Sequence, residues 1–317
     1  MQTILISGGA GFIGSNLSRL LLDDGYKVVA VDNLITGEKE NIKELLKNSN
    51  FEFIEKDVCG QDLYDGKIDF IFHLASPASP NAKSKRSYIA FPIETLLVNS
   101  AGTYNLLELA KKNNAKFLYA SSSEVYGDPK VSPQKESYFG NVNPNGPRSV
   151  YDEGKRFGEA ISMAYFRKFD VDIRIIRIFN TYGPRMRPDD GRVVSNFIIE
   201  ALNNRPVVVY GGGSQTRSFC YISDLLDGIK KAMFSKDTTG EVFNLGNPDE
   251  RSILDFARII KEMTKSSSEI KFAPLPTDDP RRRKPDITKA KTTLSWEPKV
   301  PLEEGLTKTI EYFRSSL

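Results

Sequence analysis

A tyrosine and a lysine four positions apart, Tyr151 and Lys155 in the stretch SVYDEGK, are the first side chains whose spacing suggests chemistry. Residues four apart on a helix lie on one face, one turn from each other. A phenol has a pKa near 10, and a neighbouring ammonium favours its phenolate. Such a pair can take a proton from a hydroxyl group while hydride leaves the same carbon. The spacing alone is weak, because most such pairs are solvated surface contacts.

Hydroxyl groups and an acid follow the apolar run at residues 116–122, in the stretch ASSSEVYG. Ligands of doubly wound α/β proteins bind beyond the carboxyl ends of the strands. Ser122 and Ser123 are therefore placed to hydrogen-bond the hydroxyl or ketone on which Tyr151 acts. Glu124 is a further candidate, and its alternative role is that of a strand-end acid capping a turn.

A glycine-rich turn, GGAGFIG, follows the first apolar run and precedes a helical pattern. Gly8 permits a tight turn, Gly11 lets the backbone approach a pyrophosphate, and Gly14 allows the helix to pack closely on the strand. The second strand ends at Asp32, whose carboxylate can hold the ribose hydroxyls and would repel a 2′-phosphate. The sequence therefore predicts NAD rather than NADP. The alternative for the glycines is an ordinary tight turn.

Short β-rich runs alternate with helical patterns in the first half of the chain. The runs cover residues 3–7, 27–32, 51–57, 69–75, 116–122 and 172–178, and helical spacing covers 13–25 and 93–113. This alternation predicts an α/β fold with a Rossmann-like, doubly wound parallel sheet. Beyond about residue 180 glycine and proline become more frequent. We therefore predict an NAD-binding domain at 1–180 and a smaller C-terminal α/β substrate-binding region at 181–317, with a soft boundary that the chain crosses.

The bulk composition narrows the class of protein. The 317 residues are 39% hydrophobic and 27% charged, with a net charge of +3, which favours no nucleic-acid partner. No apolar run approaches the roughly 20 residues that span a bilayer, and the first residues lack the pattern of a secretory leader. Two cysteines, Cys59 and Cys220, cannot build a disulfide framework. We expect a cytoplasmic protein without a membrane segment, and no metal site is predicted.

The longer motifs carry a resemblance to a known family. GGAGFIGSNL and YxxxK are shared by a whole superfamily, whereas SEVYGDP, YDEGKR, DGRVVSNF and RKPDI are much more specific. Nearly end to end, the chain resembles the extended short-chain dehydrogenase/reductases that act on nucleotide sugars, and within them the UDP-glucuronic acid decarboxylase (UDP-xylose synthase) branch. The resemblance identifies Tyr151 and Lys155 as the catalytic pair.

The resemblance implies a redox-neutral decarboxylation. UDP-glucuronate is oxidised at C4 by bound NAD, with Tyr151 as base and Ser123 or Ser122 as its hydrogen-bond partner. The new ketone lies β to the carboxylate, so carbon dioxide leaves as electrons flow into the carbonyl, and nearby donors stabilise the enolate. Protonation at C5 and return of hydride to C4 then give UDP-xylose.

The resemblance also assigns further residues to the site. Glu124 would position the sugar ring or relay a proton, and Arg283 of the RKPD motif would lie near the reacting sugar, with a solvated basic run as its alternative. The residues expected to hold the UDP-sugar are Asn180, Arg192, Tyr210, Gln215, Arg217 and Arg283, with loop caps and surface charges as the alternative. The residues expected to contact NAD are Gly8, Gly11, Phe12, Ile13, Gly14, Asp32, Asn33, Thr36, Gly37, Asp57, Val58, Leu74, Ala75, Ser76, Asn99, Tyr151 and Lys155; for Asp57 and Val58 the alternative is a simple strand-end turn.

The chain departs from the family pattern at two places. Ser122 stands where threonine is common, which keeps the hydroxyl group. Leu97 stands where the decarboxylases carry a lysine near the substrate, and the preceding loop is longer. Either Lys83, Lys85 or Arg86 compensates from that loop, or recognition of the substrate carboxylate is rearranged.

Three other functions remain as alternatives. A UDP-glucuronate 4-epimerase would share the oxidation but return hydride to the other face of the ketone. A 4,6-dehydratase would need adjacent Asp and Glu where this chain has Ser123 and Glu124. A redox-sensing or RNA-binding relative without turnover fits poorly with an intact Tyr151 and Lys155. We also expect a homodimer with a four-helix interface formed by the 93–112 segment and the helix of Tyr151; the alternative is that these apolar faces pack within the monomer.

Overall fold

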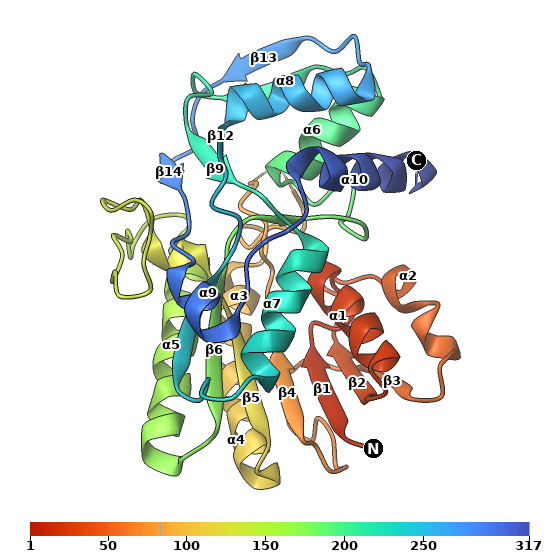
Figure 1. Ribbon diagram of the computed structural model, residues 1–317, viewed down its shortest axis with the longest axis vertical. Helices are drawn as coiled ribbons and strands as arrows, with labels where there is room; N and C mark the ends of the chain where they lie inside the picture. Colours follow the sequence, from red (N-terminus) through yellow and green to blue (C-terminus); the bar gives the residue numbers. More distant parts are fainter. Residues whose placement is uncertain (83, 317) are drawn as a thin grey trace.

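The central layer of the protein is a parallel sheet. The computed structural model describes residues 1–82 and 84–316, so Lys83 lies outside the described residues. Seven parallel strands follow the order β11-β6-β5-β4-β1-β2-β3 (Figure 1). They are β1 (Thr3–Ser7), β2 (Lys27–Asp32), β3 (Phe51–Glu55), β4 (Phe70–His73), β5 (Lys116–Ser122), β6 (Ile173–Ile178) and β11 (Glu241–Leu245). The predicted Rossmann-like doubly wound fold is confirmed.

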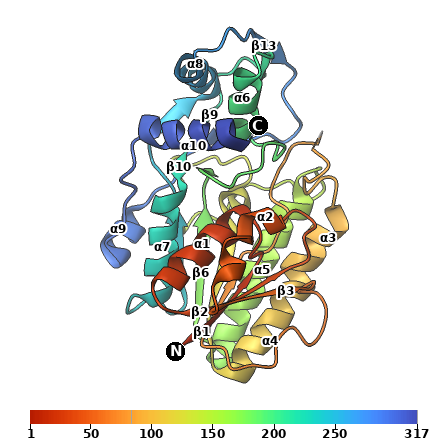
Figure 2. The ribbon, with the colours of Figure 1, turned by 90° about the vertical axis from the view of Figure 1, so that its right-hand side faces the viewer.

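Helices cover both faces of this sheet, as Figure 2 shows. One face carries α1 (Phe12–Asp23) and α7 (Ile222–Phe234); the other carries α3 (Pro92–Leu97), α4 (Thr103–Asn113) and α5 (Ser149–Phe169). Successive side chains of a strand point to opposite faces. Ile4 and Ile6 therefore join a core with Leu17 of α1, whereas Leu5 joins a second core with Leu106 of α4. Burial on both sides explains why β1 and β2 are apolar through most of their length.

The segment predicted as one helix at 93–113 contains a wider turn. A π-helical stretch, η2 (Val98–Gly102), joins α3 to α4. It contains the fully buried Asn99, whose amide donates to the hydroxyl of Ser76 at 2.9 Å and whose carbonyl oxygen accepts from Tyr119 at 2.9 Å. Turns of this kind occur frequently at functional sites. Here the hydrogen bonds of Asn99 connect η2 to Ser76, which follows β4, and to Tyr119 of β5.

A second layer lies over the carboxyl ends of the strands (Figure 1). Its small sheets pair β7 (Thr181–Tyr182) with β10 (Cys220–Tyr221), β9 (Thr216–Ser218) with β12 (Glu250–Ser252) and β14 (Arg282–Arg283), and β8 (Val207–Tyr210) with β13 (Ile270–Ala273). The remaining helices are α2 (Lys39–Ile42), α6 (Val193–Leu202), α8 (Ile253–Thr264), α9 (Thr288–Leu294), α10 (Leu302–Ser316), η1 (Leu45–Lys47) and η3 (Ser123–Tyr126).

The chain returns from this layer to the central one, because α7 and β11 belong to the sheet layer although they follow residue 180. The division at residues 1–180 and 181–317 stays a prediction. Among the described helices, none combines the length and the apolar character needed to cross a membrane.

Candidate active site

Two adjoining cavities lie beyond the carboxyl ends of the strands, between the layers. The larger measures about 550 Å³ and the smaller about 170 Å³. Both are lined in part by the same residues, namely Ile13, Leu74, Ser76, Ala78 and Arg192. Two ligands bound side by side would therefore meet at this shared wall.

The smaller cavity is lined by most of the residues predicted to contact NAD. They are Gly8, Gly11, Phe12, Ile13, Gly14, Asp32, Asn33, Thr36, Asp57, Val58, Leu74, Ala75 and Ser76. Within the described chain, Gly37 and Asn99 are not part of this lining, and Tyr151 and Lys155 line the larger cavity instead. A side chain at Gly37 would meet the Asp32 carboxylate at 2.8 Å, and Asn99 lies buried beneath Ser76.

The turn after β1 fits a dinucleotide. Gly8 has a φ of +74°, and a Cβ there would lie 2.9 Å from the backbone of Ala75. A Cβ at Gly14 would overlap the carbonyl oxygen of Gly8. Asp32 lies at the end of β2, where its carboxylate accepts from the backbone of Ala10 at 3.0 Å and of Leu34 at 2.8 Å. A close backbone turn with a fixed acid beside it is what an adenosine ribose and a pyrophosphate require.

Tyr151 and Lys155 lie one turn apart on α5, at the edge of the larger cavity. Burial raises the pKa of Tyr151 to about 12, although a hydrogen bond with the side chain of Ser122 lowers it. The Lys155 ammonium donates to the carbonyl oxygen of Ala120 at 2.9 Å and lies 5.6 Å from the centre of the Tyr151 ring. Burial lowers the pKa of Lys155 to about 7. The pKa of Tyr151 is therefore raised, opposite to the lowering expected from a neighbouring ammonium.

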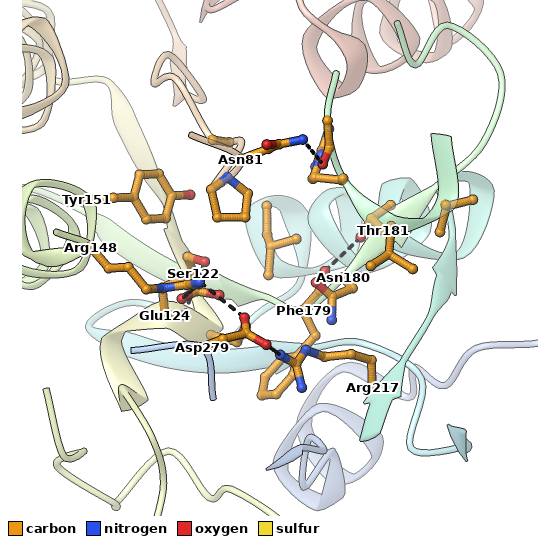
Figure 3. Close-up of a pocket in the computed structure, with 18 of the residues that line it drawn as sticks. Asn81, Ser122, Glu124, Arg148, Tyr151, Phe179, Asn180, Thr181, Arg217 and Asp279 are labelled. Carbon is orange, nitrogen blue, oxygen red and sulfur yellow. Dashed lines mark hydrogen bonds and ion pairs between the residues drawn. The ribbon is translucent and has the colours of Figure 1, made fainter. Parts of the chain in front are cut away.

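Five charged side chains form a row beside Tyr151, which we call the charge row: Arg283, Glu124, Arg148, Asp279 and Arg217. Glu124 lies between two guanidinium groups, with Arg148 Nη2 at 2.5 Å from one carboxylate oxygen and Arg283 Nη1 at 3.4 Å from the other. Asp279 joins Arg148 at 3.3 Å to Arg217 at 3.0 Å. Figure 3 shows Asp279 between these two arginines, with Glu124 and Ser122 close to Arg148. The signs of charge alternate along the row.

The charge row fixes the protonation state of Glu124. Burial by itself raises the pKa of this carboxyl group, but Arg148 and Arg283 outweigh burial and hold the pKa well below its ordinary value. Glu124 is therefore a carboxylate at neutral pH and can only accept hydrogen bonds. As a carboxylate it has no proton of its own to donate, and the two expected roles, positioning the sugar ring and relaying a proton, stay predictions.

The larger cavity brings together most of the other predicted residues. Ser122, Ser123, Glu124, Tyr151, Lys155, Asn180, Arg192, Tyr210, Gln215 and Arg217 all line it. Arg283 is outside this lining among the described residues, because it lies behind Glu124. Its side chain donates to the hydroxyl of Ser123 at 3.0 Å and to the carbonyl of Gly127 at 2.9 Å. Arg283 is 1% exposed, so the interpretation as a solvated basic run is wrong for it.

The structure also shows where the segment lies that differs from the family pattern. Leu97 is 47% exposed on α3, and Lys85 is exposed. Neither belongs to the described lining of the larger cavity. Arg86 lines the smaller cavity, where it donates to the carbonyl of Ile35 at 3.2 Å. Within the described residues, this segment therefore brings no cation to the larger cavity.

Among the charged residues that line the larger cavity, sequence reasoning missed two, Arg148 and Asp279. Arg148 has a signal that could have found it, since it immediately precedes α5 and stands three residues before Tyr151. Asp279 lies in a loop with no periodicity, and nothing in the sequence relates it to Arg148, 131 positions away. Only the folded chain places it in the cavity.

Asp152 yields a prediction about stability. It is 5% exposed, and Oδ1 has no hydrogen-bond partner among the described residues. Burial, and then the negative charge of Glu124, raise the pKa of Asp152. The folded state thus keeps this proton to higher pH than the unfolded state, so the stability of the fold falls as pH rises above the ordinary value of 3.8.

Asp152→Asn is therefore expected to raise the melting temperature at pH 7, with little change near pH 4. Glu153→Gln is the control, because the Glu153 side chain is 40% exposed, pairs with Arg156 on its own helix and is the smallest of the named causes that shift the pKa of Asp152. Thermal unfolding across this pH range checks the prediction. An equal melting temperature for Asp152→Asn and the unmodified protein at every pH would contradict it.

Comparisons with known proteins agree with this site. Residues 5–309 match the family model described as GDP-mannose 4,6 dehydratase. UDP-glucuronic acid decarboxylase 1 of Xenopus tropicalis is 54% identical over 100% of this chain and 73% of its own length. UDP-glucuronic acid decarboxylase 1 of Arabidopsis thaliana is 50% identical over 99% of this chain and 70% of its own.

Solved structures show the same architecture. The UDP-glucuronic acid 4-epimerase of Bacillus cereus, in complex with UDP-glucuronic acid and NAD, superimposes with a TM-score of 0.89 at 33% identity and covers 100% of both chains. The UDP-glucose 4-epimerase of Thermotoga maritima gives a TM-score of 0.88 at 32% identity over 99% of each chain. Because the decarboxylases are much more similar in sequence across the whole length, this chain belongs to the UDP-glucuronic acid decarboxylase family of extended short-chain dehydrogenase/reductases.

Proposed function

We propose that this enzyme removes carbon dioxide from UDP-glucuronate and forms UDP-xylose through a 4-keto sugar, with no net oxidation. The observation that carries the proposal is identity of 50 to 54% with UDP-glucuronic acid decarboxylases over 99 to 100% of the chain. The UDP-glucuronic acid 4-epimerase reaches only 33% over the same length. That lower identity makes epimerisation the second candidate.

NAD is the cofactor of this proposal. The glycine turn with Gly8 and Gly14 would hold its pyrophosphate, and Asp32 its adenosine ribose. When bound, NAD supplies the acceptor for the C4 hydride and later its donor. A carboxylate that already accepts two backbone hydrogen bonds suits ribose hydroxyls and repels a 2′-phosphate.

Side chains of the protein carry out the proton transfers of the reaction. Tyr151 takes the proton of the C4 hydroxyl as the C4–H bond breaks, and Ser122 holds the phenol in place through its hydrogen bond. Because burial raises the pKa of Tyr151, the phenolate needs a nearby positive charge, which Lys155 carries while it is protonated. After carbon dioxide leaves, the Tyr151 hydroxyl donates to the enolate oxygen and stabilises its charge.

The charged lining suits a nucleotide sugar with two anionic groups. Arg217 and Arg192 would bind the diphosphate, since a guanidinium group donates parallel hydrogen bonds to it. Asn180, Tyr210 and Gln215 line the same cavity and would contact the nucleoside. Because the 81–97 segment brings no described cation to the larger cavity, we propose that the substrate carboxylate is recognised by the lining arginines, with Arg148 nearest to Glu124.

One incubation tests the proposed reaction. Purified protein with NAD and UDP-glucuronate is expected to give UDP-xylose and an equal amount of trapped carbon dioxide, with no lasting change in nicotinamide absorbance. UDP-galacturonate formed without gas would overturn the decarboxylase in favour of the epimerase. Accumulation of the 4-keto sugar with reduced cofactor would show that the return of hydride fails.

We propose a homodimer through α3, α4 and α5. Apolar side chains remain exposed on these helices: Ile93 is 62% exposed, Tyr104 49% and Phe157 47%. The α5 helix packs against both α3 and α4, and exposed apolar surface marks interaction sites where it is contiguous. Phe157→Glu is therefore expected to give a monomer by light scattering, because a charge in an apolar interface is costly. Phe272→Glu, at an exposed phenylalanine on β13, is the control and should leave the dimer intact. A monomeric unmodified protein would contradict the proposal.

We propose the cytoplasm as its compartment. Cys59 is half-buried and Cys220 fully buried, and both are free thiols, which suits a reducing environment.

A further inference from the structure

Tyr88 lies in the segment between β4 and α3, where the chain departs from the decarboxylase pattern. Its backbone amide donates to the carbonyl of Ser79 at 3.1 Å and closes a loop. Further turns follow within the loop, with Ser87 donating to Ser84 at 3.2 Å and Phe91 donating to Ser87 at 3.1 Å. These hydrogen bonds fix where the Tyr88 side chain enters the protein.

The ring of Tyr88 stacks on the ring of Tyr151. The ring centres lie 5.0 Å apart and the planes differ by 14°. Tyr88 is 1% exposed and Tyr151 6% exposed, so this contact is buried. Aromatic pairs favour such an offset stacked arrangement. The stacked ring restricts rotation of Tyr151 and keeps water from the face that it covers.

The contact depends on the ring and not on the hydroxyl. Oη of Tyr88 is buried and makes no hydrogen bond to any described residue. Burial raises the pKa of Tyr88 far above the ordinary value, so Tyr88 stays neutral and does not compete with Tyr151 as a base. A buried hydroxyl without a partner costs stability, so the favourable contribution of Tyr88 at this place comes from its ring.

We infer that Tyr88 is a positioning residue that holds the Tyr151 ring in place by stacking, so that the Tyr151 hydroxyl stays on Ser122. This rests on the proposed function, in which Tyr151 is the base. A small misplacement of a reacting group lowers the rate steeply. The inference gives the loop at residues 79–91 a role in catalysis through Tyr88, without a direct contact to substrate.

Two kinds of substitution test the inference. Tyr88→Phe keeps the stacked ring and is expected to keep kcat within about twofold. Tyr88→Met and Tyr88→Leu remove the ring and are expected to lower kcat about tenfold with KM within about twofold. The acid limb of the kcat–pH profile should also move to lower pH, because water reaching Tyr151 lessens the burial that raises its pKa.

Tyr138→Leu is the matched control, because Tyr138 stacks on Tyr126 with ring centres 6.0 Å apart and is outside the described lining of both cavities. It should leave the pH profile unchanged. Binding of UDP and thermal unfolding, measured on every variant, separate positioning from folding. Unchanged kcat and pH profile in both Met and Leu variants would overturn the inference, as would a loss in Tyr88→Phe equal to theirs. Activity retained in Tyr151→Phe would instead overturn the assignment of Tyr151 as base.

Discussion

Tyr151→Phe is expected to lower kcat for decarboxylation of UDP-glucuronate by about 10³-fold or more. The variant loses only the phenolic oxygen, so the C4 hydroxyl keeps its proton and hydride cannot leave C4. The stacked pair with Tyr88 does not need that oxygen, and the fold should be unchanged. Nicotinamide absorbance in a single turnover, followed together with UDP-glucuronate binding, measures the effect directly.

The control for this variant is Tyr165→Phe on the same helix. The Tyr165 hydroxyl donates to Glu108, remote from both cavities. Its replacement should leave turnover unchanged. If Tyr151→Phe keeps normal turnover, another group takes the C4 proton and the assignment of the base is wrong.

Arg283→Gln is expected to lower both activity and stability. Removing one partner of a buried ion pair typically costs about 3–5 kcal/mol, because the remaining charge is left uncompensated. Arg283 is 1% exposed and holds Glu124, Ser123 and the backbone of Gly127. Denaturant unfolding should show the loss, and substrate affinity should fall because Glu124 loses one of the two groups that hold it.

Arg282→Gln is the matched control for that prediction. The Arg282 side chain is 55% exposed and pairs at 2.7 Å with Glu250, whose side chain is 12% exposed. Because the cation is exposed and Glu250 keeps its hydrogen bond from Thr216, stability should fall less than in Arg283→Gln and turnover should change little. If the two substitutions lowered stability and activity equally, the prediction would be wrong, because the loss would then come from removing a positive charge and not from the buried contacts of Arg283.

The strand and glycine signals were sufficient to predict the fold and most of the residues that line the smaller cavity. Apolar runs such as residues 3–7 and 27–32 became the buried strands β1 and β2. Gly8 and Gly14 became the close turn that opens α1. These features are local, because a few consecutive residues determine a short buried strand or a tight turn. The π turn at η2 was not predicted, because its apolar spacing differs too little from that of a regular helix.

The charge row could not be predicted from the sequence, because residues far apart in the chain form it. The run Arg281 to Lys284 does not say which arginine faces inward. The structure decides it, because alternation along β14 leaves Arg282 exposed and buries Arg283. Arg148 and Asp279 come together only through tertiary packing of α5 against a distant loop. The family resemblance pointed to Arg283, whereas the cation that lines the larger cavity beside Glu124 is Arg148.

The pKa of Tyr151 is a second point on which structure corrects the sequence. The presence of Lys155 four residues away predicts an acidified phenol. Burial of both groups reverses the direction, raising the pKa of Tyr151 and lowering that of Lys155. Desolvation disfavours the charged form of each group, and only the folded environment reveals how strongly.

The most direct test of a transient C4 oxidation uses UDP-glucuronate that carries deuterium at C4. The protein, NAD and this substrate are incubated in ordinary water, and the product is examined by NMR and mass spectrometry. Our account predicts that UDP-xylose forms more slowly than from unlabelled UDP-glucuronate, because the bond between C4 and deuterium breaks before carbon dioxide leaves, and that the product retains the deuterium at C4. Carbon dioxide released at the same rate by protein stripped of NAD would contradict the account, because decarboxylation would then proceed without the ketone.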